Sequence, residues 1–435
     1  MRLYSTKKSA PVVSLQEAVT RGLAPDQGLY MPEYIPVLPE SFFKDAPQMS
    51  FQEIACTVAG HLLGDEIPTQ DLNRIVTDTI QFDAPLVEVE NNFYALELFH
   101  GPTLAFKDFG ARFLSRMLGY YAGKRSANVT VLVATSGDTG SAVAHGFYNT
   151  PGTRVVILYP DGKVSELQEK QFTTLGGNIT ALKVAGTFDD CQRLVKQAFS
   201  DKDLNDAMAL ASANSINIAR LVPQSFYYFY AWSRLSEKQN VVFSVPSGNF
   251  GNLTAGLLAK KMGLGIDAFV AATNSNDVVP AYLTSGIYQP RPSVSTISNA
   301  MDVGNPSNFD RILELFGHDW NAIRKLITGY KFSDEETIQV MKSVYKESGY
   351  QLDPHGAVGF LGLKQFKQTP PEFKSGVFLE TAHPAKFIES VESALETKVK
   401  LPQVLEDLKT KTVLSEEFPN DFSKLKSWLL NRSAP

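Results

Sequence analysis

The sequence predicts an α/β protein with two parallel-sheet domains, helices on both faces of each sheet, and an N-terminal extension. Short β-branched segments alternate with helix-like segments from residue 129 onward, and the clearest strands are VTVLVA (129–134), RVVILYP (154–160) and VVFSV (241–245). Strands that are separated by helices favour parallel pairing, because each parallel connection has to cross one face of the sheet. Functional side chains are therefore expected in loops at the carboxyl ends of the strands.

Several helix boundaries are marked by capping residues. Ser165 is placed to cap the helix after 154–160, and TFDD (187–190) has the pattern of a capping box. SDEETIQVMKSVYKESG (333–349) is an amphipathic helix with its own box, and Gly349 stops it. The same patterns predict strands at 179–184, 267–273 and 376–382, helices around 141–148 and 253–262, and a helix whose first turn holds Pro384.

The length of 435 residues is enough for about two or three domains. We divide the chain into an N-terminal extension or cap (1–92), a smaller α/β domain (93–230) and a larger α/β domain (231–435). The first segment is rich in proline and helical patterns. The smaller domain would hold the lysine and carboxylate loops described below, and the larger one a phosphate loop and the C-terminal helices.

Composition and charge exclude several classes of protein. The chain is 43% hydrophobic and 20% charged with a net charge of −5, so neither a nucleic-acid backbone nor an anionic membrane surface should attract it. No apolar run is long enough to cross a bilayer, and the N-terminus lacks the apolar core of a signal peptide. Its two cysteines, Cys56 and Cys191, fit a reducing compartment. We expect a cytoplasmic protein without membrane or nucleic-acid partners.

The sequence also lacks the spacings of common metal and hydrolase sites. Six histidines are scattered without an HExxH pair, the cysteines form no CxxC, and there is no GxSxG elbow. We therefore expect neither a bound metal nor a serine-hydrolase triad.

One lysine stands in an apolar, turn-rich stretch. LELFHGPTLAFKDFGARF (96–113) places Lys107 between Phe106 and Asp108. A surface lysine whose stem lies over aromatic rings is one interpretation, and a lysine that forms an imine with a cofactor is the other. The stretch by itself leaves both open.

A glycine-rich turn, PSGNFGN (246–252), follows the 241–245 strand and precedes a helix. Gly248 and Gly251 would let backbone amides approach a ligand, and the helix adds its partly positive N-terminus. This arrangement suits a phosphate. The turn lacks GK[ST] and does not spell GxGxxG, so a nucleotide or dinucleotide site is not indicated. An ordinary tight turn is the alternative.

The turn ATSGDTGSA (134–142) also joins a strand to a helix. Thr135, Ser136 and Thr139 cluster hydroxyls around Gly137, and such a group of donors would hold a carboxylate. Helix capping alone explains the same residues equally well.

A third polar segment, SANSINIAR (212–220), contains Asn214, Ser215, Asn217 and Arg220 within one or two turns of backbone. Arg220 could pair bidentately with an anion. A solvated helix start with a surface arginine is the alternative. Taken together, a lysine, a phosphate turn, a carboxylate loop and a second anion site fit pyridoxal 5′-phosphate and a substrate with two anionic groups.

Five segments in this order resemble the threonine synthase family: HGPTLAFKDF, TSGDTG, SANSINIAR, SVPSGNFGN and LETAHPAKF. The resemblance is to the longer bacterial and fungal form, because DQGLYMPE (26–33) is similar to its N-terminal extension. ISNAMDVGNPSN (297–308) is a further similar segment. This family belongs to the fold type II, tryptophan synthase β-like, pyridoxal-phosphate enzymes.

The resemblance implies a role for each matching residue. Lys107 would carry the cofactor, and Thr381 would hydrogen-bond its pyridine nitrogen, giving a milder electron sink than a carboxylate would. Many relatives have asparagine where Asp138 stands, and an ionised aspartate there would repel the cofactor's phenolate oxygen. The cofactor phosphate would be bound by Gly248, Asn249, Phe250 and Asn252, the substrate carboxylate by Thr135, Ser136, Gly137, Asp138 and Thr139, and the substrate phosphate by Asn214, Ser215 and Arg220.

The implied reaction converts O-phospho-L-homoserine and water into L-threonine and phosphate, with Lys107 as the base that takes the Cα proton. Three alternatives stay open. They are another fold type II lyase such as a threonine dehydratase or cysteine synthase, a phosphohomoserine phospholyase that releases ammonia and a 2-oxo acid, and a cofactor-binding relative without turnover. A monomer or a homodimer is expected.

Overall fold

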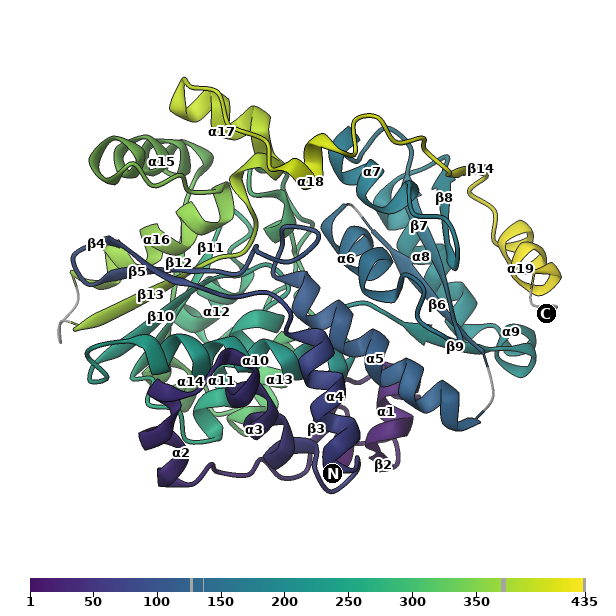
Figure 1. Ribbon diagram of the computed structural model, residues 1–435, viewed down its shortest axis with the longest axis horizontal. Helices are drawn as coiled ribbons and strands as arrows, with labels where there is room; N and C mark the ends of the chain where they lie inside the picture. The colour runs from purple at the N-terminus through teal and green to yellow at the C-terminus, as the bar shows by residue number, and fades with distance from the viewer. Residues whose placement is uncertain (126–127, 136, 369–372, 433–435) are drawn as a thin grey trace. The chain divides into compact units, whose positions relative to one another are not determined.

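The computed structural model describes residues 1–125, 128–135, 137–368 and 373–432 (Figure 1). It divides into two compact units, each assembled from separate stretches of chain. Unit 1 comprises Met1–Met31, Lys107–Arg220 and Leu401–Pro435, and unit 2 comprises Pro32–Phe106 and Leu221–Lys400.

These units differ from the predicted segments 1–92, 93–230 and 231–435. The reason is that residues 1–31 and 401–432, near the two ends of the chain, pack within unit 1. The sequence pattern reports local structure, and it carries little information about which distant segments pair.

Unit 1 is built on a sheet with the strand order β14-β8-β7-β6-β9. Every neighbouring pair runs parallel. The strands are β6 (Val129–Ala134), β7 (Thr153–Pro160), β8 (Ile179–Val184), β9 (Ala209–Ser212) and β14 (Glu416–Phe418). Near-continuous burial along β6 and β7 is what a parallel sheet covered on both faces requires.

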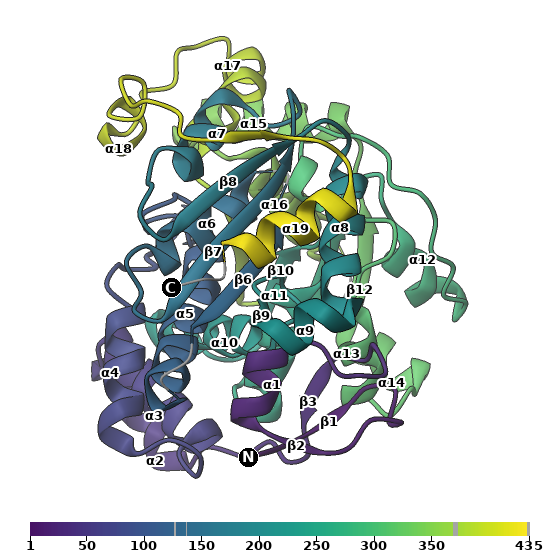
Figure 2. The same cartoon turned by 90° about the vertical axis from the view of Figure 1, so that its right-hand side faces the viewer.

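Helices cover both faces of this sheet. One face carries α8 (Phe188–Ser200), α9 (Lys202–Ala207) and α19 (Phe422–Asn431), which lie in front of the strands in Figure 2. The other face carries α5 (Lys107–Arg125), α6 (Asp138–Phe147) and α7 (Glu166–Thr173). Side chains along β7 point alternately to the two faces, as expected for a sheet covered on both sides. Val156 and Leu158 belong to the core under α8, whereas Tyr159 packs on Phe172 of α7.

The first residues of the chain form a small sheet and a helix that belong to unit 1. The sheet has the order β2-β1-β3, and α1 packs against β9 and α5. Asn217 ties this segment to the rest of the unit, because its Nδ2 donates to the Val19 carbonyl at 2.9 Å. The elements are β1 (Arg2–Ser5), β2 (Val13–Ser14), α1 (Leu15–Arg21) and β3 (Tyr30–Pro32).

Unit 2 is built on a sheet with the order β12-β11-β10-β13-β5-β4. Neighbours run parallel except β4 and β5, which form an antiparallel pair. The strands are β4 (Leu86–Glu90), β5 (Phe93–Glu97), β10 (Val241–Pro246), β11 (Ala268–Thr273), β12 (Ile327–Lys331) and β13 (Ser375–Glu380).

Helices also cover both faces of the second sheet, above and below it in Figure 1. α16 (Pro354–Phe366) packs on the face of Phe378, where its Phe360 ring lies 5.4 Å from the Phe378 ring. α10 (Ile218–Arg234) packs on the opposite face, where the Tyr228 ring lies 5.1 Å from that of Phe243. α11 (Gly251–Lys261) joins α10 there, since a Cβ on its Gly256 would come within 2.7 Å of Phe269.

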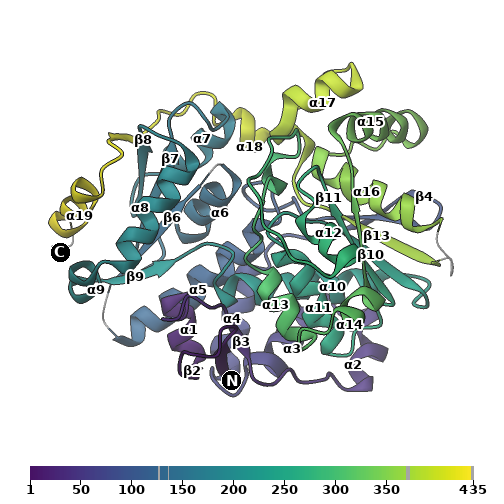
Figure 3. The same ribbon diagram turned by 180° about the vertical axis from the view of Figure 1, so that it is seen from behind.

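The remaining elements are not part of the two main sheets or the helices named above. Figure 3 shows the structure from the back of Figure 1, where α12, α13 and α14 are visible. Those in unit 2 are α2 (Glu40–Asp45), η1 (Ala46–Gln48), α3 (Phe51–Leu63), α4 (Thr69–Thr79), α12 (Val278–Ser285), η2 (Asn299–Met301), α13 (Phe309–Leu315), α14 (Trp320–Leu326), α15 (Asp334–Ser348), η3 (Pro384–Phe387) and α17 (Ile388–Leu395). α18 (Gln403–Glu406) belongs to unit 1.

The predicted fold class is confirmed, and so are the predicted caps. The Ser165 side chain accepts from the Gln168 amide, and both capping boxes, at Thr187 and Ser333, are complete. Some boundaries differ from the prediction: the helix expected around 141–148 already begins at Asp138, the helix expected around 253–262 begins at Gly251, and the strand expected to reach residue 382 ends at Glu380. In the described part of the chain, every helix is too short or too polar to traverse a bilayer.

Candidate active site

Lys107 is the first residue of α5 in unit 1, and it faces the start of α6. Its Nζ lies 3.6 Å from Oδ2 of Asp138. The Lys107 side chain is 18% exposed and that of Asp138 is 7% exposed. A surface lysine laid over aromatic rings therefore does not describe Lys107, whose amine is largely enclosed and ion-paired.

The loop between β6 and α6 places Asp138. Gly137 has a φ of 142°, a conformation that residues with a Cβ rarely adopt. The Thr135 hydroxyl accepts from the amides of Gly137 at 3.0 Å and Gly140 at 2.8 Å, so it caps α6 from within the loop. Thr139 is half-buried in the first turn of α6, and Ser136 lies outside the described residues. Binding of a substrate carboxylate here stays a prediction.

Gln168 of α7 fixes Asp138 from its other side. The Gln168 Nε2 donates to Oδ1 of Asp138 at 3.0 Å, and Ser165 Oγ donates to Gln168 Oε1 at 3.0 Å. A Cβ at position 137 would come within 2.8 Å of the Gln168 amide, so glycine is needed there for space as well as for φ. Sequence reasoning missed Gln168, although the predicted cap at Ser165 placed it in the first turn of a helix.

Arg220 is buried near the start of α5. It is 3% exposed, and its Nη1 donates to the Ala213 carbonyl at 2.8 Å. Burial lowers the pKa of Arg220 to about 10, and the nearby Asp108 carboxylate opposes this shift. A Cβ at Gly110 would come within 2.8 Å of the Arg220 Nε, so the two helix starts pack closely. The alternative of a surface arginine is therefore wrong.

The other polar residues of the 212–220 segment differ in their roles. Asn217 is fully buried, and its side chain bonds to the Val19 and Ser212 carbonyls and to the Ala219 amide. It holds the segment in place. Asn214 and Ser215 are half-buried just before α10, and their predicted contact with a substrate phosphate stays a prediction.

The glycine-rich turn of unit 2 lies between β10 and α11, as predicted. Phe250 caps α11 in the left-handed conformation, with a φ of 61°. A Cβ at Gly248 would come within 2.7 Å of the Met301 backbone, so this glycine lets another segment approach the turn. Asn249 bonds the same segment, because its Oδ1 accepts from the Ser307 amide at 2.6 Å. The 297–308 segment, noted from its similarity alone, thus packs against the turn.

Asn252 is oriented by two buried tyrosines of α10. The hydroxyls of Tyr227 and Tyr228 both donate to the Asn252 Oδ1 at 2.8 Å. The side chain is 6% exposed, and its Nδ2 has no hydrogen-bond partner among the described residues. A buried donor without a partner is costly, so an acceptor of a ligand is expected at this point. Sequence reasoning did not single out these two tyrosines, because no local pattern indicates that they contact Asn252.

Thr381 directly follows β13 in unit 2 and is almost completely buried. Its carbonyl accepts from the Phe106 amide at 2.8 Å, and the His383 amide donates to the Leu104 carbonyl at 3.0 Å. Residues 104–106 are therefore bound to residues 381–383, and Phe106 is the residue before Lys107 in the chain. The predicted bond from the Thr381 hydroxyl to a pyridine nitrogen stays a prediction.

A buried acid pair lies beside Thr381. Burial and the nearby Asp353 carboxyl raise the pKa of Glu380 well above its usual range, which favours the protonated form of this carboxyl. Asp353 accepts from the His355 Nδ1 at 2.6 Å, and the His355 Nε2 accepts from the Ala300 amide at 3.2 Å. Since Ala300 packs against Gly248, these bonds link the strand that ends at Glu380 to the segment beside the glycine-rich turn.

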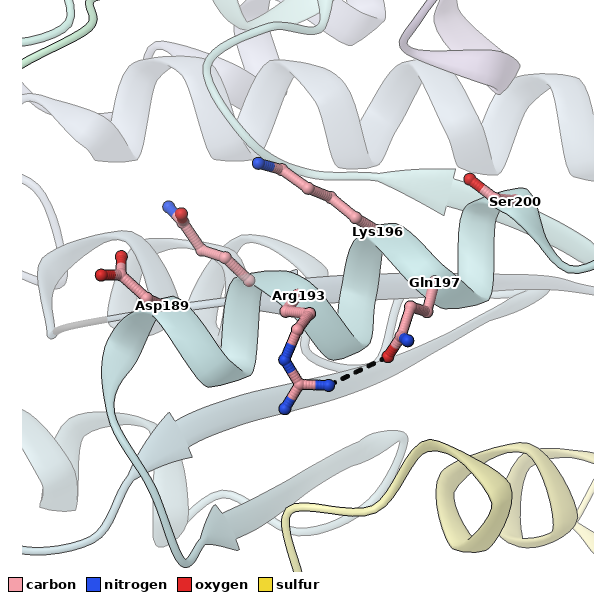
Figure 4. A pocket seen from close by; sticks show the side chains of 6 residues that line it. Asp189, Arg193, Lys196, Gln197 and Ser200 are labelled. Atoms are coloured by element: carbon pink, nitrogen blue, oxygen red, sulfur yellow. Dashed lines mark hydrogen bonds between the residues drawn. The ribbon is translucent and has the colours of Figure 1, made fainter.

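Other parts of the described chain offer weaker candidates. A hollow over α8 in unit 1 is lined by side chains of that helix alone, and Figure 4 presents them fanning outward, with Arg193 bonded to Gln197. They are mostly exposed and provide no enclosed polar group, so this surface does not suit a tightly bound ligand. Among the described residues, no group of three or more His, Cys, Asp and Glu side chains could hold a metal ion.

The residues present fit pyridoxal 5′-phosphate. Unit 1 offers an enclosed lysine amine, and unit 2 offers a helix N-terminus with a glycine-rich turn and the buried Asn252 donor, which suits a phosphate oxygen. The comparison with known families agrees. A model described as "Pyridoxal-phosphate dependent enzyme" matches residues 75–379, "Threonine synthase N terminus" matches 2–80, and "Threonine synthase, C-terminal" matches 356–429.

Full-length relatives decide the family. The chain is 49% identical to the threonine synthase of Haemophilus influenzae over 433 residues, which cover 99% of this chain and 100% of that protein. It belongs to the threonine synthase family. The threonine synthase of Saccharomyces cerevisiae is 37% identical over 477 residues, with 93% of each chain covered.

Solved structures of threonine synthases have the same fold. The crystal structure of the Escherichia coli enzyme superposes with a TM-score of 0.91 at 47% identity, covering 99% of this chain and 100% of that one. A pyridoxal-phosphate-bound threonine synthase from Brucella melitensis gives a TM-score of 0.93 at 37% identity and covers both chains completely. A maize serine racemase at 17% identity, with a TM-score of 0.54, shares the fold alone. The fold type II assignment and the pyridoxal-phosphate cofactor are thereby confirmed.

Proposed function

We propose that the protein converts O-phospho-L-homoserine and water into L-threonine and phosphate. End-to-end similarity to threonine synthases supports this reaction. The observation that carries it within the structure is the burial of Arg220 beside the start of the helix that holds Lys107. A dehydratase or a cysteine synthase has no need of a second anion site, whereas a phosphorylated substrate does.

Lys107, the turn of Gly248, Asn249, Phe250 and Asn252, and Thr381 would hold pyridoxal 5′-phosphate. When bound, this cofactor supplies an electron sink for negative charge at the substrate α-carbon. Asn252 would bind its phosphate through Nδ2, because the two tyrosines already occupy the Oδ1 of that amide. The N-terminus of α11 would add its partial positive charge to the same phosphate.

Lys107 would act as the base that takes the Cα proton from the substrate. A lysine can do this only when its amine is uncharged. The amine then holds the proton as an ammonium group beside the Asp138 carboxylate, 3.6 Å away. From there the proton can be returned to the carbon skeleton.

Arg220 would bind the phosphate of the substrate and keep it in place as it leaves. The guanidinium is held by its bond to Ala213, so its orientation is fixed before the substrate arrives. The start of α6, with Thr135, Gly137 and Thr139, would orient the substrate carboxylate. Both cysteines are free thiols, which agrees with a cytoplasmic location.

The test is an assay of the purified protein with and without added cofactor. We expect a cofactor absorbance that depends on Lys107, release of phosphate from O-phospho-L-homoserine, and an equal amount of L-threonine. Formation of 2-oxobutyrate and ammonia in place of threonine would identify a phospholyase. Cofactor binding without phosphate release would identify a relative without turnover.

A further inference from the structure

We propose that Asp138, held by Gln168, is the charge partner of Lys107 and strengthens this lysine as a base. The proposal rests on the proposed function, because it concerns how the same lysine works. It gives Asp138 a role toward the amine in addition to its place in the loop expected to bind a substrate carboxylate. It also makes Gln168, on a separate helix, a positioning residue of the site.

The geometry joins three side chains from three helices of unit 1. Oδ2 of Asp138 lies 3.6 Å from Nζ of Lys107, and Oδ1 accepts from Nε2 of Gln168 at 3.0 Å. The two oxygens of the Asp138 carboxylate therefore make different contacts: Oδ2 faces the lysine amine, and Oδ1 accepts the hydrogen bond from Gln168 that orients the carboxylate. All three side chains are largely enclosed, so water screens their interaction weakly.

The Gln168 amide can present its nitrogen to Asp138 because its oxygen is already engaged. Ser165 Oγ donates to Gln168 Oε1, which leaves Nε2 as the group that faces Asp138. The Gly137 backbone packs against the same amide. Gln168 is thus locked by the N-cap of α7 on one side and by the α6 loop on the other, and the carboxylate keeps one orientation.

The sign of the effect follows from the charge. A carboxylate within about 4–6 Å favours the ammonium form of a lysine, typically by about 1–3 pH units, and burial of the amine opposes it. As Lys107 takes the Cα proton, positive charge develops on Nζ, where the Asp138 carboxylate stabilises it. The N–H bond forms on Lys107 as the Cα–H bond breaks, and Asp138 itself keeps its charge throughout.

Other charged groups lie on the three helices and on the elements that pack against them. Asp108 follows Lys107 on α5 and acts electrostatically on Arg220. On α7, Glu166 pairs with Lys170 at 3.1 Å, and Glu169 accepts from the Tyr159 hydroxyl. The elements packed against these helices carry further charged groups: Arg112 and Arg116 on α5, the latter donating to the Gly146 carbonyl at 2.6 Å, Lys183 on β8, which lies 3.8 Å from Glu169, Glu17 and Arg21 on α1, which pair with each other, and His145 at the end of α6.

The experiment measures how the attachment of cofactor to Lys107 depends on pH. Cofactor-free protein is mixed with pyridoxal 5′-phosphate at a series of pH values, the attachment is trapped with borohydride, and the modified peptide is quantified by mass spectrometry. Only an uncharged amine reacts, so the midpoint of the pH curve reports the protonation of Lys107. Turnover is measured on the same preparations.

Asp138→Asn keeps the shape and the bond to Gln168 but removes the charge. We expect its attachment midpoint to move about 1 pH unit or more toward acid, while turnover falls roughly tenfold or more because the base is weaker. Easier attachment at low pH combined with slower turnover is a pair of effects that damage to the fold does not produce. An unchanged midpoint would overturn the proposal.

Gln168→Met tests the positioning residue, and it also carries the test if Asp138→Asn does not fold. Methionine fills a similar volume without the donor, so the carboxylate loses its fixed orientation, and we expect a shift in the same direction. The matched control is Asp201→Asn, which removes an ion-paired aspartate elsewhere in unit 1, 2.9 Å from Lys426, and should leave the midpoint unchanged. A wild-type midpoint in Gln168→Met would remove Gln168 from the arrangement.

The lysine assignment is checked separately. In Lys107→Ala the modified peptide should disappear. If it persists, or if the wild-type protein is labelled at another residue, the proposed function loses its lysine. If labelling depends on Lys107 and phosphate is released, but both variants keep the wild-type midpoint, the charge-partner proposal fails alone.

Discussion

The carboxyl group of Glu380 occupies the space in which a side chain at Gly356 would stand. Glu380 ends β13, and Gly356 lies in the first turn of α16, whose N-cap Asp353 pairs with the same glutamate. The carboxyl is completely buried, so it cannot swing away into water. The helix can approach the strand this closely because residue 356 has no Cβ.

Gly356→Ala should therefore destabilise the protein by about 1–3 kcal/mol, the usual range for overpacking a core. Urea unfolding measures this change. The double variant Gly356→Ala, Glu380→Ala should recover part of the loss, because the new methyl group then has room. Gly60→Ala in α3 is the control, since a Cβ there meets nothing within 4 Å, and it should stabilise by about 0.5–1 kcal/mol. A neutral Gly356→Ala would contradict the close approach.

The raised pKa of the buried Glu380 should make stability depend on pH. Its pKa is raised in the folded protein, so between its ordinary value of 4.5 and the folded value the native state holds a proton that the unfolded state has lost. The free energy of unfolding then falls as pH rises, by at most about 1.4 kcal/mol per pH unit from this group. Burial is the largest influence on Asp353 and would raise its pKa, but the interactions with His355 and the hydrogen bond with Glu380 together lower it, so the contribution of Asp353 is instead lost on acidification.

Glu380→Gln keeps the hydrogen-bond donor and removes the titration. We expect the variant to gain stability relative to the wild type as pH rises above the ordinary glutamate value of 4.5, measured by urea unfolding at a series of pH values. Glu335→Gln, at an exposed position of α15, is the matched control. Its free energy of unfolding should change with pH in the same way as that of the wild type. If the free energy of unfolding of Glu380→Gln also changes with pH as in the wild type, the Glu380 carboxyl is ionised when buried.

The Asn252 amide should determine how tightly the cofactor is held. Asn252→Asp replaces the donor with an oxygen that repels a phosphate, and we expect the dissociation constant of pyridoxal 5′-phosphate to rise roughly 10–100-fold. Pyridoxal, which has no phosphate, should be affected much less, and this difference locates the contact. A fluorescence titration of cofactor-free protein measures both constants.

The two tyrosines should act through the same amide. Tyr227→Phe combined with Tyr228→Phe frees the Asn252 Oδ1, so the amide loses its fixed orientation and the cofactor should bind several-fold more weakly. Tyr288→Phe, whose hydroxyl donates to Asn305, removes a comparable bond away from Asn252 and should leave the affinity unchanged. If the double variant binds the cofactor normally, the tyrosines do not orient the donor.

Arg220 should separate substrate binding from cofactor binding. Arg220→Ala is expected to raise the KM for O-phospho-L-homoserine strongly, on the order of 100-fold, since a charge-assisted bidentate bond is lost. The cofactor absorbance should persist. Arg220→Lys keeps the charge without the planar, two-donor guanidinium, so its KM should lie between those of the wild type and Arg220→Ala. Unchanged kinetics in Arg220→Ala would remove this residue from the substrate site.

Features that depend on neighbouring residues could be predicted from the sequence. The capping boxes at Thr187 and Ser333 depend on residues three apart, and the strands of both sheets depend on short β-branched runs, so each signal is local. The same holds for the glycine-rich turn, where strand, glycines and helix follow one another. The boundary at Glu380 was missed because the residues after it also suit a strand.

Features that depend on distant residues could not be predicted. Gln168 meets Asp138, and Tyr227 meets Asn252, only because separate helices are packed on a sheet. Arg220 has the sequence surroundings of a solvated helix start, yet the close approach at Gly110 buries it. The membership of residues 1–31 in unit 1 is of the same kind, since no local pattern indicates that α1 packs on α5.

The pairing of β14 with β8 has a consequence for biosynthesis on the ribosome. β14 completes the outer edge of the sheet in unit 1, and Phe418, Leu425 and Leu429 complete the core under α8. All segments of unit 2 are translated before these residues emerge. A nascent chain therefore carries β8 as an open edge with an uncovered apolar surface for much of its synthesis, and this is the stage at which chaperones would be needed most.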